Sequence, residues 1–514
     1  MMNLRGLCFS LSLLVVSACQ AKTDEVPPFS YQDTRATCSA LTNLSPELPG
    51  MEIASAQPLP ATDTLPAFCQ VTGTINPNIG FEARYPLTDW NGKYFQSGCG
   101  GFCGVVLANK EGQSNAINYA LRKGYATITT DAGHQGQHIG DGRWAKDNPE
   151  AEAVYAHKTI PLTFAAGHLL VNALYSSAPT YSYFSGCSNG GRMGAIAAQR
   201  YPDLFDGIVV GCPVLNLSVN GGVFGAWVLQ SNQGEDGRPI LDVDFLPKLP
   251  MLEAAVLAQC DSLDGATDGI ISEPQSCTPD LARLETCGET ETASCLTAQE
   301  KTVISKWYQG ARNSQGEAIF HGMSPGSERY WGFWYIGDGS VPGAGTLLAD
   351  GYGAYLGFPE DPKDYSALDF NFDTDVDKLA EQGKLFNALN PDLRAFKAFG
   401  GKMIMWHGMA DPLVLPDQSP AYYRAVEMEM GGYDAVQTFF RLFMAPGLGH
   451  CWEAPASAPD QMDVLGALEN WVENGIAPET IEVTQYDKNA DKVLRKGTLR
   501  PFPQTETYST VLSD

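Results

Sequence analysis

The sequence has little positive charge for its length. Among 514 residues, 33 Lys and Arg stand against 59 Asp and Glu, and the formal net charge is −26. A surface this acidic repels phosphate backbones, so nucleic acid is not expected as a partner. After Cys19 the chain also lacks an apolar run long enough to cross a bilayer, and it has no internal repeat or low-complexity tract. The acidic composition is typical of a solvated exported protein but does not identify a substrate.

A short apolar run occurs at the N-terminus. Arg5 precedes it, the run extends from Leu7 to Val16, and small residues lead into Cys19. This order is typical of an export signal of the lipoprotein type. We therefore expect a signal peptide over residues 1–19, a lipid anchor to the outer membrane at Cys19, and a tether over residues 20–37. The alternative is ordinary cleavage a few residues later, which would give a periplasmic or extracellular protein.

Thirteen cysteines are present, and eleven remain when Cys8 and Cys19 are set aside. In an exported protein this number implies disulfide bonds. The count is odd, so at least one cysteine stays unpaired. Spacing alone does not decide which cysteines pair.

Strand-like apolar runs alternate with helical patterns along much of the chain. Strands are expected at 93–97, 126–130, 182–185, 207–210, 402–406 and 437–444, and helices at 160–175, 191–199 and 459–474. This alternation predicts an α/β fold with a mostly parallel sheet. The rhythm is lost between residues 215 and 390, where Cys, Gly, Asp and Trp accumulate. We expect a lid over 215–390, inserted in a catalytic domain made of residues 38–214 and 391–514, which ends in a polar tail.

One motif points to nucleophilic catalysis. Gly186-Cys187-Ser188-Asn189-Gly190 follows the strand-like run and precedes a helix of small residues. A strand, G-x-S-x-G and a helix in this order form the nucleophile elbow of an α/β-hydrolase fold, which predicts Ser188 as the nucleophile. The same pattern around Ser324 does not qualify, because the next residue must donate its backbone N–H to the oxyanion and Pro325 has none.

The oxyanion requires two backbone N–H donors. Asn189 follows the nucleophile and is expected to supply one of them. The second donor comes from a turn after an early strand, and the glycine-rich residues 98–104 form such a turn. Gly101 and Gly100 are the candidates, and the sequence does not choose between them.

The base and the acid follow from chain order, which in this fold is Ser, acid, His. His450 lies on a glycine-rich turn after an apolar strand and is expected to be the general base. Asp411 lies on the loop after the preceding strand and is expected to orient it. His407 ends that strand and is interpreted as a structural histidine. Asp131 precedes Ser188 and is interpreted as structural as well.

The pattern Cys187-Ser188, Asp411 and His450-Cys451 resembles the tannase and feruloyl esterase family. The similarity extends from about Cys38 to Pro503. It implies a disulfide between Cys187 and Cys451, which would hold the nucleophile and base loops together. It also implies the bridges Cys38–Cys69, Cys260–Cys277 and Cys287–Cys295, and it leaves Cys99, Cys103 and Cys212 unassigned.

The resemblance further implies a structural Ca²⁺ ion in the lid. Three carboxylates lie on the glycine-rich loop that follows Cys260, and hard cations prefer such oxygen ligands. The implied ligands are the side chains of Asp261, Asp264 and Asp268 and the carbonyls of Ala266 and Ile270. By composition alone, a plain Asp-Gly turn is an equal alternative. No organic cofactor is expected.

The lid contains an aromatic run whose members Trp331, Phe333 and Trp334 are candidates for substrate contact, although core packing is the alternative for each. Together with the resemblance, this predicts an exported serine esterase that hydrolyses esters of aromatic acids, such as feruloyl, galloyl or terephthaloyl esters, through an acyl-enzyme. The alternatives are an acyltransferase or peptidase that uses the same triad, and a catalytically silent lipoprotein that binds aromatic ligands.

Overall fold

The computed structural model describes residues 31–43, 50–110, 116–451, 458–487, 492–504 and 508–510. The expected signal peptide and the first part of the expected tether lie outside these residues. Residues 31–37, expected in the tether, lie instead in helix α1 (Tyr31–Ala40). Cys38 in this helix is bonded to Cys69 and is fully buried, so the segment is docked on the body of the protein. No helix of the described segments has the length and apolarity to cross a membrane.

A nine-stranded sheet forms the centre of the molecule, with strand order β1-β2-β3-β5-β4-β6-β7-β8-β9. The first three strands, β1 (Met51–Leu59), β2 (Phe68–Ile75) and β3 (Ile79–Pro86), form an antiparallel meander that β3 joins to β5. The other strands run parallel: β4 (Lys93–Ser97), β5 (Ala126–Thr130), β6 (Tyr181–Cys187), β7 (Gly207–Gly211), β8 (Lys402–Gly408) and β9 (Phe440–Ala445). The carboxyl ends of parallel strands meet at one edge, where α/β proteins bind ligands.

Helices cover both faces of this sheet. Neighbouring residues on a strand alternate between the faces, as Phe184 and Tyr183 do, so the core consists of two apolar clusters. Helices α4 (Thr159–Tyr175), α5 (Asn189–Arg200) and α12 (Gln418–Met430) contribute to one cluster, and α2 (Asn118–Arg122) and α14 (Val464–Asn474) to the other. This arrangement is the α/β-hydrolase type of fold that the sequence predicts.

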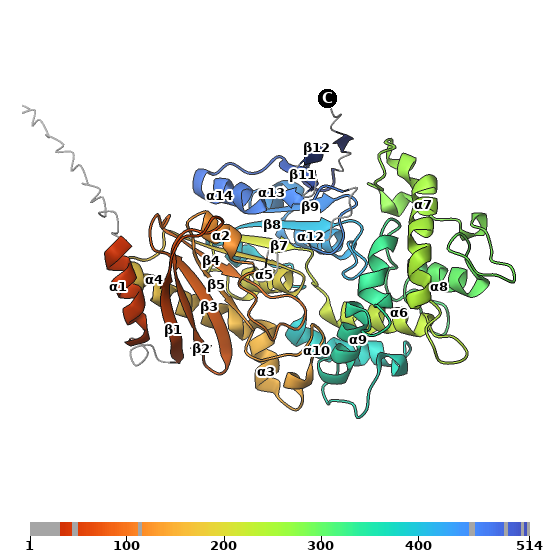
Figure 1. Cartoon of the computed structure of the whole chain (residues 1–514), viewed down its shortest axis with the longest axis horizontal. Coiled ribbons are helices and arrows are strands. Elements are labelled where there is room, and N and C mark those ends of the chain that lie inside the picture. The colour runs from red at the N-terminus through yellow and green to blue at the C-terminus, as the bar shows by residue number, and fades with distance from the viewer. Residues whose placement is uncertain are drawn as a thin grey trace, which may run out of the picture.

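The predicted lid contributes no strand to the sheet, because β7 ends at Gly211 and β8 begins at Lys402. Its main helices are α6 (Gly225–Ser231), α7 (Leu249–Cys260), α8 (Ala298–Gln309), α9 (Ala344–Tyr355) and α10 (Asp375–Phe386). Figure 1 shows α6 to α9, in green and teal, gathered beside the sheet on the side opposite to α1.

The C-terminal region is not the polar tail that the sequence suggests. Strands β10 (Gln461–Met462), β11 (Ile481–Asp487), β12 (Lys492–Leu499) and β13 (Ser509–Thr510) form a second, antiparallel sheet. In β11 the side chains of Ile481 and Val483 are buried, whereas the intervening Glu482 is exposed. The strand therefore has a period-2 apolar pattern, but its few apolar residues make this pattern weak in the sequence.

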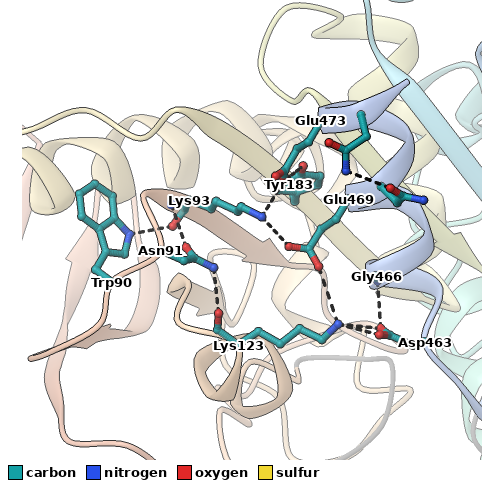
Figure 2. Close-up of polar contacts among 11 residues, drawn as sticks. Trp90, Asn91, Lys93, Lys123, Tyr183, Asp463, Gly466, Glu469 and Glu473 are labelled. Atoms are coloured by element: carbon teal, nitrogen blue, oxygen red, sulfur yellow. Dashed lines mark hydrogen bonds and ion pairs between the residues drawn. The ribbon is translucent and has the colours of Figure 1, made fainter. Parts of the chain in front are cut away.

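Ion pairs attach helix α14 to the start of the parallel strands (Figure 2). The Nζ atom of Lys93, at the beginning of β4, lies 2.7 Å from a carboxylate oxygen of Glu469 and 2.6 Å from one of Glu473. The Lys123 Nζ atom lies 2.7 Å from the carboxylate of Asp463, which also accepts the Gly466 N–H in the first turn of the helix. These contacts fix the position of the helix that follows the His450 loop in the chain.

Candidate active site

Ser188 stands on a tight turn between β6 and α5. Its backbone has φ +64° and ψ −124°, a conformation that side-chain-bearing residues rarely adopt. A Cβ atom on Gly186 would lie 2.5 Å from the carbonyl carbon of Gly190, and one on Gly191 would lie 2.3 Å from the carbonyl oxygen of Gly211. Gly186 of the motif and Gly191 next to it are therefore required for the close approach of strand and helix. As a result Ser188 is half-buried at the sheet edge while its neighbours are fully buried.

His450 and Asp411 are joined by a short hydrogen bond. The Nδ1 atom of His450 lies 2.6 Å from Oδ2 of Asp411, which is fully buried. The other carboxylate oxygen accepts the backbone N–H groups of Leu413 and Val414, both at 2.9 Å. Burial alone would raise the pKa of Asp411, but the imidazoles of His450 and His407 more than offset this and hold the pKa at about 2. Asp411 is therefore a carboxylate near neutral pH.

His407 is a second histidine on the same carboxylate. Its Nε2 atom lies 3.3 Å from Oδ2 of Asp411 and 2.9 Å from the carbonyl oxygen of Val414, and its Nδ1 atom lies 2.7 Å from Oγ of Ser419. The side chain is fully buried, so it contacts the Asp411 carboxylate inside the protein and has no access to a substrate. This agrees with its interpretation as a structural histidine.

Neither Asp131 nor Ser324, the two alternatives considered in the sequence, lines a cavity together with Ser188. Asp131 accepts the backbone N–H groups of Gly80 and Gly133, and burial raises its pKa to about 6. Ser324 lines a separate surface hollow beside Pro325.

Two cavities meet at Ser188. The outer cleft has a volume of about 490 Å³, and its walls include His450, Gly101, Phe333 and Trp334. The inner recess has about 40 Å³ and is lined mainly by apolar groups, among them Phe102, Tyr155, Val214, Leu217 and Tyr335. The outer cleft is large enough for a small organic ester, whereas the recess admits a group of a few atoms.

The turn after β4 meets the start of α5 next to Ser188. Asn189 is the first residue of α5, so its N–H has no acceptor within the helix. Gly101 has φ +57°, and no hydrogen bond of its N–H is recorded among the described residues, whereas the next N–H, that of Phe102, donates to Ile139. The Gly100 carbonyl accepts the Cys103 N–H and closes the turn. Gly101 lines both cavities that meet at Ser188, whereas Gly100 lines the outer cleft and not the recess, so the geometry favours Gly101 as the second donor.

Two polar side chains that the sequence analysis did not identify, Tyr155 and Arg192, join the side chain of Asn189 in holding this turn against α5. The Tyr155 hydroxyl lies 3.2 Å from the Gly101 carbonyl oxygen and 3.1 Å from Oδ1 of Asn189. The fully buried Arg192 donates its Nε–H to the same Oδ1 at 2.7 Å, and the Asn189 amide nitrogen donates to the Cys99 carbonyl at 3.2 Å. The sequence does hint at Arg192, because an arginine one turn after the nucleophile is unusual in a helix of small residues. No sequence pattern points to Tyr155.

Five disulfides are present among the described residues. Four are the bridges that the resemblance implies: Cys38–Cys69, Cys187–Cys451, Cys260–Cys277 and Cys287–Cys295. The fifth bridge, Cys99–Cys103, closes the turn that contains Gly101. The four-residue spacing of these cysteines within a glycine-rich segment was the sequence feature that could have predicted it. Cys212 belongs to none of these five bridges and is buried.

The lid aromatics divide into two groups. Trp334 is packed edge-on against His450, with ring centroids 5.2 Å apart, and Phe333 is 60% exposed at the rim of the outer cleft. Trp331 lines neither cavity: it is fully buried, packs on Trp307 at 5.0 Å and donates its indole N–H to Ser327. The expectation of a substrate contact is therefore wrong for Trp331, because consecutive residues of a helical turn face different sides and this one faces the lid core.

The expected calcium loop is a compact acidic turn. Backbone N–H groups of the loop donate to the carboxylates of Asp261 and Asp264, and Oδ2 of Asp268 is buried without a hydrogen-bond partner among the described residues. Burial raises the pKa of Asp268, and the charges of Asp261 and Asp264 add to this effect. The nearest counter-charge is Arg495, with Nη1 3.7 Å from Oδ2 of Asp268. The three carboxylates do not bring one oxygen each within 4.8 Å of one another.

Comparison with known proteins identifies the family of the chain. The family model described as tannase and feruloyl esterase matches residues 64–512. The chain belongs to the tannase and feruloyl esterase family. It is therefore a carboxylic ester hydrolase.

Individual relatives match over most of their length. An uncharacterised esterase of Xanthomonas campestris pv. campestris is 36% identical over 92% of this chain and 88% of its own. The mono(2-hydroxyethyl) terephthalate hydrolase of Piscinibacter sakaiensis is 30% identical over 86% of this chain and 83% of its own. The crystal structure of feruloyl esterase B from Aspergillus oryzae superimposes with a TM-score of 0.78 at 25% identity, covering 92% of this chain and 96% of that one.

Proposed function

We propose that the protein hydrolyses esters of aromatic acids through an acyl-enzyme formed on Ser188. The observation that carries the proposal is the Asp411–His450 hydrogen bond of 2.6 Å at the cleft that Ser188 also lines. Asp411 accepts the Nδ1–H of His450, which leaves Nε2 free to take the Ser188 proton. The backbone strain at Ser188 keeps its hydroxyl at the sheet edge, where a substrate carbonyl can reach it.

The reaction then follows from the positions of the donors. The Ser188 oxygen attacks the ester carbonyl, and the oxyanion accepts the N–H groups of Gly101 and Asn189. His450 gives its proton to the leaving alcohol and next activates the water that releases the acid. Tyr155 and Arg192 do not touch the reacting atoms; they hold the two donor segments together by their shared contact with the Asn189 side chain.

The aromatic character of the substrate rests on the relatives' substrates and on the cleft wall. Trp334 packs against His450 and lines the outer cleft beside it, and Phe333 extends this aromatic wall to the rim. We place the aromatic ring in the outer cleft and its small substituents in the recess next to Tyr155. Trp334→Ala should then raise KM for methyl ferulate more than KM for p-nitrophenyl acetate, which has no aromatic acyl group.

Ser188→Ala tests the mechanism on a panel of methyl ferulate, methyl gallate, mono(2-hydroxyethyl) terephthalate and p-nitrophenyl butyrate. The unmodified protein should prefer an aromatic ester and should be labelled at Ser188 by a fluorophosphonate probe. The variant should lose turnover and labelling while keeping its melting temperature. Retained turnover in the variant would exclude the serine mechanism, and activity on the butyrate alone would exclude the aromatic substrate class.

A structural Ca²⁺ ion is proposed for the acidic loop. The support is chemical: three carboxylates lie within eight residues, and one of their oxygens, Oδ2 of Asp268, is buried and accepts no hydrogen bond from the described residues. The carboxylates of Asp261, Asp264 and Asp268 do not bring one oxygen each within 4.8 Å of one another, so they would have to close around the ion to hold it, and its charge would offset their mutual repulsion. EDTA should lower the melting temperature, and added Ca²⁺ should restore it more effectively than Mg²⁺. Identical melting curves in EDTA and Ca²⁺ would refute the site.

Export is proposed from the N-terminal pattern, with lipidation at Cys19. Mass spectrometry of the N-terminal peptide from membrane and soluble fractions tests it. An unprocessed Met1 would exclude export, and an unmodified N-terminus downstream of Cys19 would exclude lipidation.

A further inference from the structure

One buried cation beside the nucleophile elbow has no counter-charge among the described residues. Arg192 is fully buried and forms no ion pair with any of them. The other buried lysine and arginine side chains each lie within 3.0 Å of a carboxylate, in the pairs Arg84–Glu82, Lys248–Glu300 and Arg441–Glu479. Burying a guanidinium without a counter-charge is costly, so the stability of the fold does not explain why Arg192 is there.

The contacts of Arg192 satisfy its donors without neutralising its charge. Its Nε–H donates to Oδ1 of Asn189 at 2.7 Å. Its Nη1 and Nη2 groups donate at 2.9 to 3.3 Å to backbone carbonyl oxygens, those of Phe386, Ala156 and Tyr155. All of these partners are neutral dipoles. Burial lowers the pKa of Arg192 from its ordinary value of 12.5, but an arginine stays protonated near neutral pH, so the positive charge persists.

The place of Arg192 in helix α5 is also unfavourable for a cation. The helix begins at Asn189, so Arg192 lies in its first turn, where the helix dipole already creates a positive potential. Acidic residues are preferred at such a position, and this first turn has none. The guanidinium therefore adds to the positive potential of the helix N-terminus. Neither its burial nor its position favours the resting protein, which points to an anion that forms only during the reaction.

The N-terminus of α5 is the place where such an anion forms in the proposed mechanism. When the Ser188 oxygen adds to the ester carbonyl, the electron pair of the C=O π bond moves onto the carbonyl oxygen, which the N–H groups of Asn189 and Gly101 then bind. Arg192 is hydrogen-bonded to the side chain of Asn189, and the Tyr155 hydroxyl lies between that side chain and the Gly101 carbonyl. All residues of this first turn are buried, so water screens the charge only weakly.

We propose that Arg192 supplies the counter-charge of the oxyanion. The inference rests on the proposed acyl-enzyme mechanism and adds a charge that the two N–H donors do not provide. Arg192 touches neither the substrate nor the reacting atoms, so it is a positioning residue that acts through Asn189 and through its electrostatic field. This charge is in place before the reaction, and it stabilises the anionic transition state more than the neutral ester. Its removal should therefore lower kcat and leave KM nearly unchanged.

Arg192→Met removes the charge and keeps an aliphatic side chain. With methyl ferulate as substrate, kcat should fall about 10- to 100-fold and KM should stay within about threefold. A trifluoromethyl ketone analogue of ferulate accepts the Ser188 oxygen and forms an adduct that carries the oxyanion. Its inhibition constant should rise by the same factor by which kcat/KM falls. Because the charge is buried, both changes should be equal at about 50 mM and about 500 mM NaCl. A raised KM with unchanged kcat would overturn the proposal.

Arg192→Lys separates the charge from the hydrogen-bond geometry. A lysine retains a positive charge, but it cannot reproduce the planar contacts of the guanidinium. Burial should lower the pKa of this lysine below its ordinary value of about 10.4, so kcat should decrease at alkaline pH with an ionisation that the unmodified protein lacks. Below that pKa, kcat should exceed that of Arg192→Met. A kcat as low as that of Arg192→Met, without the added ionisation, would show that only the shape of Arg192 matters and would overturn the proposal.

The pH profile requires only the lysine variant, so it tests the proposal even if Arg192→Met does not fold. A lysine variant that is folded by its melting temperature and has the pH profile of the unmodified protein, displaced to a lower kcat, would likewise overturn the proposal. The same profile recorded for Ki of the trifluoromethyl ketone should show the added ionisation, because the adduct carries the charge that the ammonium stabilises.

Arg200→Met is the control for the loss of an arginine from the same helix. Arg200 ends α5, donates to the carbonyl oxygens of Lys384 and Leu385, and forms no ion pair with any described residue. Its replacement should leave kcat and the inhibition constant within about twofold. Equal losses in the two methionine variants would assign the effect to helix packing and overturn the proposal. Failure of the proposed function gives a different result, since Ser188→Ala would then keep its turnover whatever Arg192 contributes.

Discussion

Asp411→Asn should reduce kcat by about four orders of magnitude. In the structure Oδ1 of Asp411 accepts two backbone N–H groups, from Leu413 and Val414, while Oδ2 faces the imidazoles. An asparagine must keep its oxygen on the backbone donors, because its NH₂ group cannot accept them. The NH₂ group then faces Nδ1 of His450, which must become an acceptor, so the ring proton moves to Nε2. A histidine protonated at Nε2 cannot take the Ser188 proton.

The magnitude follows from the loss of the correct tautomer. In serine hydrolase triads this substitution lowers kcat by about 10⁴-fold, which corresponds to about 5.4 kcal/mol of transition-state stabilisation. Substrate contacts are unchanged, so KM should stay within a few-fold. The assay is methyl ferulate hydrolysis at pH 7.5 on protein whose fold is verified by its melting temperature.

Asp131→Asn is the matched control for Asp411→Asn. Asp131 is also a buried carboxylate that accepts two backbone N–H groups, from Gly80 and Gly133, but it has no histidine partner among the described residues. Its replacement should leave kcat within a few-fold of the unmodified protein. If Asp411→Asn kept more than about a tenth of kcat, or if Asp131→Asn lost as much, the assignment of the acid would be wrong.

Three further predictions concern the loops and the lid. Replacing Cys187 and Cys451 together by Ser should lower the free energy of unfolding by about 5 kcal/mol, because their bridge closes a sequence separation of 264 residues; urea denaturation measures it. Gly101→Ala should lower kcat about 10²- to 10³-fold in steady-state kinetics. The φ of Gly101 is +57°, and the added Cβ would lie 2.3 Å from Cγ1 of Ile139, so the substitution would displace an oxyanion donor. Glu328→Gln should stabilise the protein at pH 8 and not at pH 4, because burial raises the pKa of Glu328 to about 7; melting temperatures at the two pH values measure it.

The sign of the Glu328 effect follows from proton linkage. The folded state keeps the proton up to a pKa of about 7, whereas the unfolded chain loses it near the ordinary glutamate pKa of 4.5. The contribution of the protonated group is therefore present below pH 4.5 and is lost as the pH rises to 7, by up to about 3 kcal/mol. Equal stabilisation by Glu328→Gln at both pH values would contradict the titration.

The other two predictions have their own contrary outcomes. Gly316→Ala is the control for Gly101→Ala, since Gly316 also has a positive φ of +79° but an added Cβ would meet nothing within 4 Å. If both glycine variants lost kcat equally, backbone strain and not the oxyanion donor would be the cause. A loss below about 1 kcal/mol in the Cys187 and Cys451 double variant would show that the bridge does not constrain the unfolded chain.

The sequence by itself determined what depends on local pattern and chain order. The strand, the G-x-S-x-G turn and the small-residue helix are contiguous, so the elbow at Ser188 is readable from one segment. The chain order of serine, acid and histidine predicted Asp411 and His450, and the structure joins these two residues by a hydrogen bond. Alternating strands and helices likewise indicated the parallel part of the sheet, because their periodicity is local.

Only the tertiary structure decided features that arise where distant segments meet. Tyr155 is 34 positions before Asn189 and contacts it through its side chain, which no local pattern indicates. Trp331 and Trp334 are equally aromatic, and only packing places the former in the lid core and the latter on His450. The cluster of Cys187, Cys212 and Cys451 depends on the order of β6 to β9 in the sheet. Strand order and side-chain facing are set by long-range packing, and a sequence pattern specifies which residues are apolar without specifying which of them meet.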